Sequence, residues 1–133
     1  MYFMFNPKRL KVLDRAIDLV PVIERLSDKF PRREDYELGS QIRRAAKRIG
    51  SNIDEGNSRG ITEYIYFLKC AIGSCNEVET QLKMVFKLGY VGEKKFEEVR
   101  DEVIEIRRML FGVIKFLEKR EKEEEEKKEK KKE

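Results

Sequence analysis

The chain has 133 residues, of which 42% are charged and 40% apolar, and its formal net charge is +4. This length fits one domain with a single core, and the composition favours a helical protein. No apolar run reaches roughly 18 residues, and the apolar residues 1–5 are too few for the core of a signal peptide, so we expect a cytoplasmic protein with no membrane segment. Histidine, the commonest metal ligand, is absent, and we expect no metal or cofactor.

The first helical pattern covers residues 7–29 and contains two apolar stripes. The first stripe comprises Leu10, Leu13, Ile17 and Val20, and the second comprises Val12, Ala16, Leu19, Ile23, Leu26 and Phe30. Pro21 interrupts the pattern, and Phe30-Pro31 ends it because a proline disfavours the helical conformation in the residue before it.

The second helical pattern, residues 36–56, is apolar on one narrow face. That face comprises Ile42, Ala45, Ala46, Ile49 and Ile53. At about 100° per residue, the basic residues of the same segment fall on the opposite face. We therefore expect a basic strip that faces water, made of Arg43, Arg44, Lys47 and Arg48.

The third and fourth patterns, residues 62–88 and 93–118, alternate steps of three and four between apolar residues. The stripe of the third comprises Tyr64, Leu68, Ala71, Cys75, Val78, Leu82 and Val85, and the stripe of the fourth comprises Phe96, Val99, Val103, Ile106, Leu110, Val113 and Leu117. This rhythm is typical of left-handed helix packing. With short connecting loops it predicts an all-α, up-down-up-down antiparallel four-helix bundle over residues 1–118.

Residues 119–133 read KREKEEEEKKEKKKE and form a charged C-terminal tail. The tail contains no apolar residue, so it cannot belong to the core. It either extends the fourth helix into solvent or is disordered.

The polar stretch GSNIDEGNSRG, residues 50–60, does not match a catalytic or phosphate-binding motif. Asp54 and Glu55 are consecutive, so their side chains diverge by about 100° on a helix and form no carboxylate pair. The glycines match neither the Walker nor the dinucleotide spacing. Gly56 returns to the apolar face, where a missing side chain lets a neighbouring helix approach. We therefore expect no catalytic residue and no enzyme.

Glu79 falls inside the apolar arc of the third helix. A lone buried carboxylate is costly, so we expect a partner, either Asn52 or Arg44, in a polar link between the second and third helices.

Several short segments together point to one family: residues 41–45 (QIRRA), 51–56 (SNIDEG), Arg59, residues 67–68 (FL), 73–74 (GS), 77–82 (EVETQL) and 88–90 (LGY). They resemble the four-helix-bundle family of ribosomal RNA intervening-sequence proteins, which includes accessory proteins of diversity-generating retroelements. The resemblance covers roughly residues 8–118. The chain departs from the family in having Asp54 where alanine is usual, Pro21 in the first helix, and the charged tail.

The resemblance implies a homopentameric barrel of bundles with a basic surface. For the retroelement members it implies binding of nucleic acid and of a reverse transcriptase. In such a ring, Asn52, Glu55, Gly56, Arg59 and Glu79 are expected to serve structure or subunit contact, with Glu55 paired to Arg48 or Arg59 in its own or the adjacent subunit.

The leading hypothesis is therefore a non-enzymatic scaffold that binds RNA or DNA through phosphate contacts, without sequence specificity. The expected contacts are the four basic residues of the second helix, Arg43, Arg44, Lys47 and Arg48, and a cluster at the start of the first, Lys8, Arg9, Lys11 and Arg15.

Two other hypotheses stay open at this point. The chain could be a protein-binding adaptor that seats its partner on Tyr2, Phe3 and Phe5. It could also be a carboxylate-based, metal-dependent hydrolase that uses Asp54, Glu55 and Glu79, although the helical geometry scatters these groups.

Overall fold

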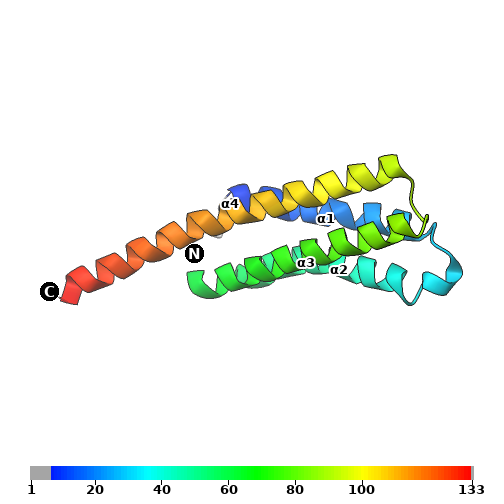
Figure 1. Cartoon of the computed structure of the whole chain (residues 1–133). Helices are drawn as coiled ribbons and strands as arrows, with labels where there is room; N and C mark the ends of the chain where they lie inside the picture. Colours follow the sequence, from blue (N-terminus) through cyan, green and yellow to red (C-terminus); the bar gives the residue numbers. More distant parts are fainter. Residues whose placement is uncertain (1–6, 133) are drawn as a thin grey trace.

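Four long helices form an all-α antiparallel bundle in the computed structural model, which describes residues 7–132 (Figure 1). The helices are α1 (Pro7–Ser27), α2 (Leu38–Gly56), α3 (Ile61–Lys87) and α4 (Glu93–Lys132), and a short 3₁₀ helix, η2 (Arg32–Glu34), lies between α1 and α2. Around the bundle, α1 packs on α2, α2 on α3, α3 on α4, and α4 on α1. No helix in this described range is long and apolar enough to cross a membrane.

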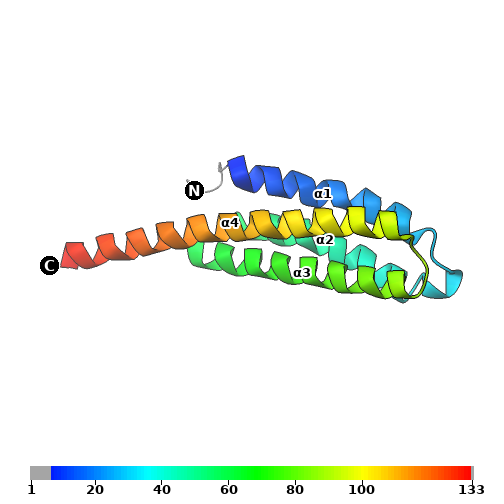
Figure 2. The same ribbon diagram turned by 45° about the horizontal axis from the view of Figure 1, so that its top comes forward.

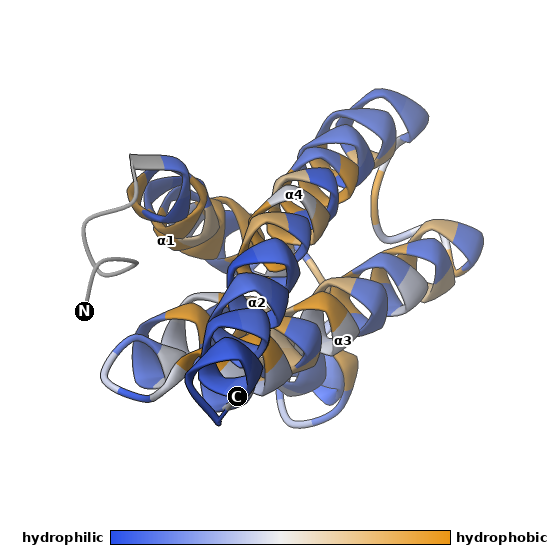
Figure 3. Cartoon of the chain, turned by 90° about the vertical axis from the view of Figure 1, so that its left-hand side faces the viewer, coloured by the Kyte–Doolittle hydropathy of each residue, from blue (hydrophilic) through white to orange (hydrophobic). Residues whose placement is uncertain are grey.

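The core consists of the apolar faces that the three-four rhythm indicated. Every residue of the expected α3 and α4 stripes is buried. Viewed along the bundle, the apolar sides of the helices face one another, and the end of α4 is hydrophilic throughout (Figure 3). Of the two apolar stripes of α1, the one from Val12 to Phe30 is buried, whereas Leu10 and Ile17 of the other are exposed.

The connections at one end of the bundle are held by hydrogen bonds. α3 ends at Lys87, and Gly89, two residues beyond it, has a positive φ of 80° that suits glycine. The Tyr90 amide donates to the Val85 carbonyl at 2.9 Å and the Gly89 amide to the Phe86 carbonyl at 3.0 Å, which together make a Schellman motif. The Tyr90 hydroxyl then donates to Glu34 at 2.9 Å, so the α3–α4 loop is tied to η2.

α4 continues as a helix to Lys132, and its last turns project beyond the other three helices (Figures 1 and 2). Of the two alternatives for the tail, the structure thus has the helical extension. At 40 residues, α4 is about 60 Å long.

Candidate nucleic-acid interface

The four basic residues of α2 lie beside its apolar face, but they do not form one free strip. Lys47 reaches Glu24 of α1 at 3.2 Å, and Arg48 reaches Glu77 of α3 at 2.7 Å. Arg44 donates to the Ser40 hydroxyl at 2.9 Å. Because that hydroxyl is neutral, this bond does not neutralise the charge of Arg44. The basic residues of α2 therefore pair with acidic residues of two different helices, α1 and α3.

Arg43 differs from the other three because it is less exposed. It is half-buried, and it donates to the Ser27 hydroxyl at 3.1 Å and to the Asp35 carbonyl at 2.9 Å. These two bonds join the end of α1 to the loop before α2. Arg43 faces water only in part, and because both bonds occupy its guanidinium we remove it from the proposed contacts.

Lys47 and Arg48 remain accessible despite their acidic partners. Their side chains are 59% and 47% exposed. Surface ion pairs of this kind contribute about 0–1 kcal/mol, because water screens the charges and two long side chains lose freedom. A phosphate group can therefore compete with Glu24 and Glu77 for these cations.

The expected basic cluster of α1 is divided as well. Lys8 and Lys11 are exposed. Arg9 is only 5% exposed, so a phosphate cannot reach its guanidinium, and the prediction of Arg9 as a nucleic-acid contact is wrong. It lies 3.8 Å from Asp54 and beside the Tyr64 hydroxyl, at the end of the bundle. Burial raises the pKa of Tyr64 to about 12, and the cation of Arg9 partly opposes this.

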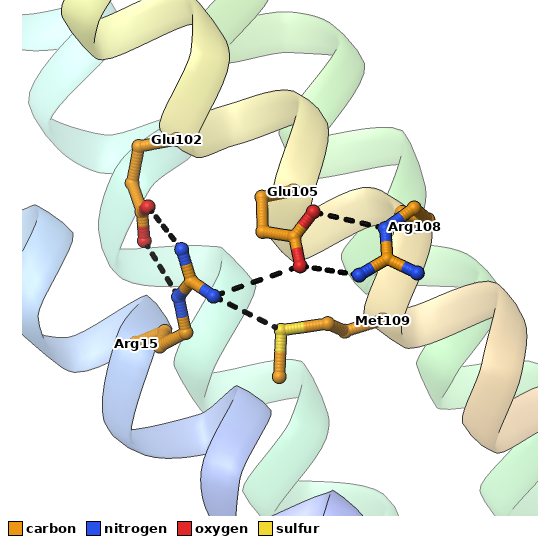
Figure 4. Close-up of polar contacts among 5 residues, drawn as sticks. All are labelled: Arg15, Glu102, Glu105, Arg108 and Met109. Carbon is orange, nitrogen blue, oxygen red and sulfur yellow. Dashed lines mark hydrogen bonds and ion pairs between the residues drawn. The ribbon is translucent and has the colours of Figure 1, made fainter.

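Arg15 is held by the acidic edge of α4 (Figure 4). Its Nε and Nη2 atoms donate to the two carboxylate oxygens of Glu102 at 3.0 and 2.5 Å, a bidentate geometry that strengthens the pair. Its Nη1 atom lies 3.6 Å from Glu105 and contacts the Met109 sulfur at 3.7 Å. Glu105 is also bound by Arg108. Arg15 therefore fastens α1 to α4, and we do not include it among the proposed phosphate contacts.

Among the polar residues at and just after the end of α2, Arg59 connects α2 to α3. Glu55 accepts a hydrogen bond from Arg59, one of its two expected partners, at 2.7 Å. Arg59 also donates to Glu63 at 3.0 Å. The Arg59 guanidinium lies over the ring of Phe67, 5.0 Å from its centre. The Asn52 side chain donates to the Arg48 carbonyl of its own helix at 2.9 Å.

Gly56 is buried where the end of α2 packs tightly against the start of α3. A Cβ atom on this residue would lie 2.7 Å from a ring carbon of Tyr64 and 2.9 Å from the Phe67 Cβ. Real Cβ atoms do not come this close, so the missing side chain is what allows the contact.

Glu79 does have a charged partner, but not a predicted one. Arg107 of α4 donates to it at 2.7 Å, and Lys83 lies 3.7 Å away on α3 itself. The expectation of Asn52 or Arg44 is wrong, because Glu79 faces α4 and not α2. The side chain is 17% exposed, and the hydrogen bond from Arg107, reinforced by both cations, lowers its pKa although partial burial acts against this.

Replacing Glu79 with glutamine is expected to reduce the loss of stability in acid. The folded-state pKa of Glu79 is lowered, so its ion pair stabilises the fold above the ordinary glutamate pKa of 4.5 and is lost as pH falls below that value. Urea midpoints at pH 7 and pH 3 measure this: the wild type should lose more stability between them than E79Q. Glu118→Gln, at an exposed position of α4, is the control. Equal acid sensitivity of E79Q and wild type would contradict the assignment.

The carboxylates of the hydrolase hypothesis do not converge. Asp54 faces Arg9, Glu55 binds Arg59, and Glu79 lies on the α4 side of α3. Within residues 7–132, no group of three histidine, cysteine or carboxylate residues could hold a metal ion. Burial raises the pKa of the Cys75 thiol to about 12, so it is not a nucleophile at neutral pH. Tyr2, Phe3 and Phe5 of the adaptor hypothesis lie outside the described residues.

The most extensive polar contacts of α4 were not anticipated from the sequence. Arg107 and Glu102 both flank the apolar stripe of α4, on opposite sides of it. The signal for Arg107 was available, since a carboxylate in the apolar arc of α3 requires a cation on a neighbouring helix. The pairing of Arg15 with Glu102 depends on which stripe of α1 enters the core, and the sequence left that open.

The comparisons with known proteins agree with this bundle. The family model described as 23S rRNA-intervening sequence protein matches residues 8–112. A crystal structure of a protein of unknown function from the S23 ribosomal protein family of Bacteroides thetaiotaomicron has the same fold, with a TM-score of 0.75 and 24% identity over 81% of this chain and 98% of that one. No curated protein matches the sequence. Because this family model matches most of the chain, the chain belongs to the family of 23S rRNA-intervening sequence proteins.

Proposed function

We propose that the chain is a non-enzymatic subunit of a homo-oligomeric scaffold, a pentamer by its family resemblance, that binds the phosphate backbone of RNA or DNA. The contacts are Arg44, Lys47 and Arg48, which we call the α2 face. The resemblance to retroelement accessory proteins further suggests a reverse transcriptase as the partner that such a scaffold would serve.

The observation that carries the proposal is the exposure of these three cations on one helix. They follow one another at intervals of three and one residues, and the segment from Leu38 to Ile53 contains no acid. Their neutralising partners, Glu24 and Glu77, come from other helices and are bound through weak surface pairs. A polyanion that offers several phosphates at once gains from counterion release, which a single carboxylate does not supply.

Self-association is supported by the apolar stripe that α1 leaves at the surface. Leu10 and Ile17 are exposed, and an open groove of about 570 Å³ runs between α1 and α2. The residues that line it are Leu13, Ala16, Ile17, Val20, Pro21, Lys47, Gly50, Ser51 and Asp54. Contiguous exposed apolar surface of this kind marks interaction sites in soluble proteins. Native mass spectrometry of the full chain tests the subunit number.

Replacing all three residues of the α2 face with glutamate is expected to abolish binding of a labelled RNA–DNA duplex. For the wild type, the logarithm of the binding constant should fall linearly with the logarithm of salt concentration, with a slope of about −0.9 for each neutralised phosphate. Fluorescence anisotropy at several salt concentrations measures both the affinity and this slope.

The matched control makes the same change of charge elsewhere. Lys69, Lys94 and Lys115 are exposed lysines on α3 and α4, and their replacement with glutamate alters the net charge equally. The control should bind more tightly than the α2-face variant, and native mass should be the same for both. If the α2-face variant binds as the wild type does, the residue assignment is wrong.

A further inference from the structure

The end of α4 forms a helical arm outside the bundle. Leu117 is the last buried residue of the chain's described part, and Thr62 at the start of α3 donates a hydrogen bond to Glu121. From Lys122 to Lys132 every side chain is exposed. This end of α4 projects past the other helices (Figure 2). These eleven residues, which we call the arm, extend about 16 Å. They lie outside the segment that matches the family.

The order of charges explains why the arm is helical without a core. Three glutamates precede a lysine by four residues: Glu123 precedes Lys127, Glu124 precedes Lys128, and Glu126 precedes Lys130. Each such pair stabilises a helix by about 0.2–0.5 kcal/mol, more in this order than in the reverse. Lysines in the last turn also complement the negative end of the helix dipole.

The same order separates the charges into two blocks. Residues 123–126 are four glutamates, and residues 127–132 contain five lysines and one glutamate. The five lysines, which we call the tip, are Lys127, Lys128, Lys130, Lys131 and Lys132. The acidic block lies between the tip and the bundle, so the strongest concentration of positive charge is carried away from the folded domain.

We propose that the tip is a second contact for the phosphate backbone of nucleic acid, beyond the α2 face. This inference rests on the nucleic-acid binding proposed above. A lysine ammonium is a compact charge that binds phosphates without base specificity, and each contact releases counterions. The arm has no apolar side chain to insert into a bilayer, which membrane-surface helices require, so a membrane is the poorer fit.

The position of the arm defines how long the nucleic acid must be. Arg48 lies eight residues before the end of α2, about 12 Å along its axis, and that end of the bundle is where the arm leaves. The tip lies about 10–16 Å farther on. A ligand that touches both must therefore span about 20–30 Å along the axis, or roughly six to nine base pairs at about 3.4 Å each.

The test replaces the five tip lysines with glutamine in the full chain. Binding of a 24-base-pair RNA–DNA duplex should weaken about tenfold or more near physiological salt, and the salt slope should fall by about 2–4. A hairpin with a stem of four base pairs, about 14 Å long and too short for both contacts, should show a much smaller change.

The matched control replaces Glu123, Glu124, Glu125 and Glu126 with glutamine. It removes the same three glutamate–lysine pairs and leaves the tip intact, so circular dichroism should show a similar loss of helix in both variants. Its affinity for the duplex should equal or exceed that of the wild type.

Three results would overturn the inference: an unchanged affinity and salt slope in the lysine variant, equal losses in both variants, or binding of the tip to vesicles of anionic lipid with none to duplex.

The α2-face variant, measured in parallel, keeps the two proposals distinct. Loss of binding in that variant alone supports the α2 face and overturns the arm. Loss in the lysine variant alone supports the arm and overturns the α2 face.

Discussion

Replacing Ile106 with alanine is expected to lower the free energy of unfolding by about 2–5 kcal/mol. Ile106 has no exposed surface and lies at the centre of the α4 stripe. Truncation removes buried apolar atoms and leaves a cavity that the rigid helices can only partly fill. Urea unfolding followed by circular dichroism measures the change in midpoint.

Ile104→Ala is the matched control, with the same chemistry two residues away on the same helix. Ile104 is 39% exposed and faces outward, so little buried area is lost. Alanine also has the higher helix propensity. We expect a change within about 1 kcal/mol. Similar losses in the two variants would mean that the three-four seam does not define the core.

Replacing Gly56 with alanine is expected to cost about 1–3 kcal/mol, although alanine normally favours a helix. The added Cβ would overlap the Tyr64 ring and the Phe67 Cβ, and it would lie 3.3 Å from the Tyr64 Cα. A backbone atom cannot rotate away, so α2 and α3 must separate at this end. The pairing of Arg59 with Phe67 would then weaken as well.

Gly73→Ala provides the comparison in the middle of α3. A Cβ at Gly73 meets nothing within 4 Å, so only helix propensity changes, and stability should rise by about 0.5–1 kcal/mol. The two glycine variants thus have opposite expected signs. Stabilisation of the protein by Gly56→Ala would show that the α2–α3 contact is looser than the structure has it.

The placement of polar residues beside the core was only partly predictable. Periodicity assigned Glu79 to the apolar arc and required a partner for it, yet it gave no means to choose between a cation on α2 and one on α4. The burial of Arg9 was likewise not predictable from the sequence, because an arginine in the first turn of a helix is usually exposed. In the structure, Asp54 lies 3.8 Å from Arg9 and supplies an acidic partner for the buried cation.

The sequence by itself determined the all-α class, the four helices, the buried stripes of α2, α3 and α4, and the need for glycine at Gly56. These features follow from local rules, since an apolar stripe at helical spacing must be buried, whichever helix packs against it. The tertiary structure decided which stripe of α1 is buried, which helix supplies the partner of Glu79, and which basic residues stay in water. Those outcomes depend on the rotation of each helix against its neighbours, and that rotation is set by the packing of all four helices together, which no single segment encodes.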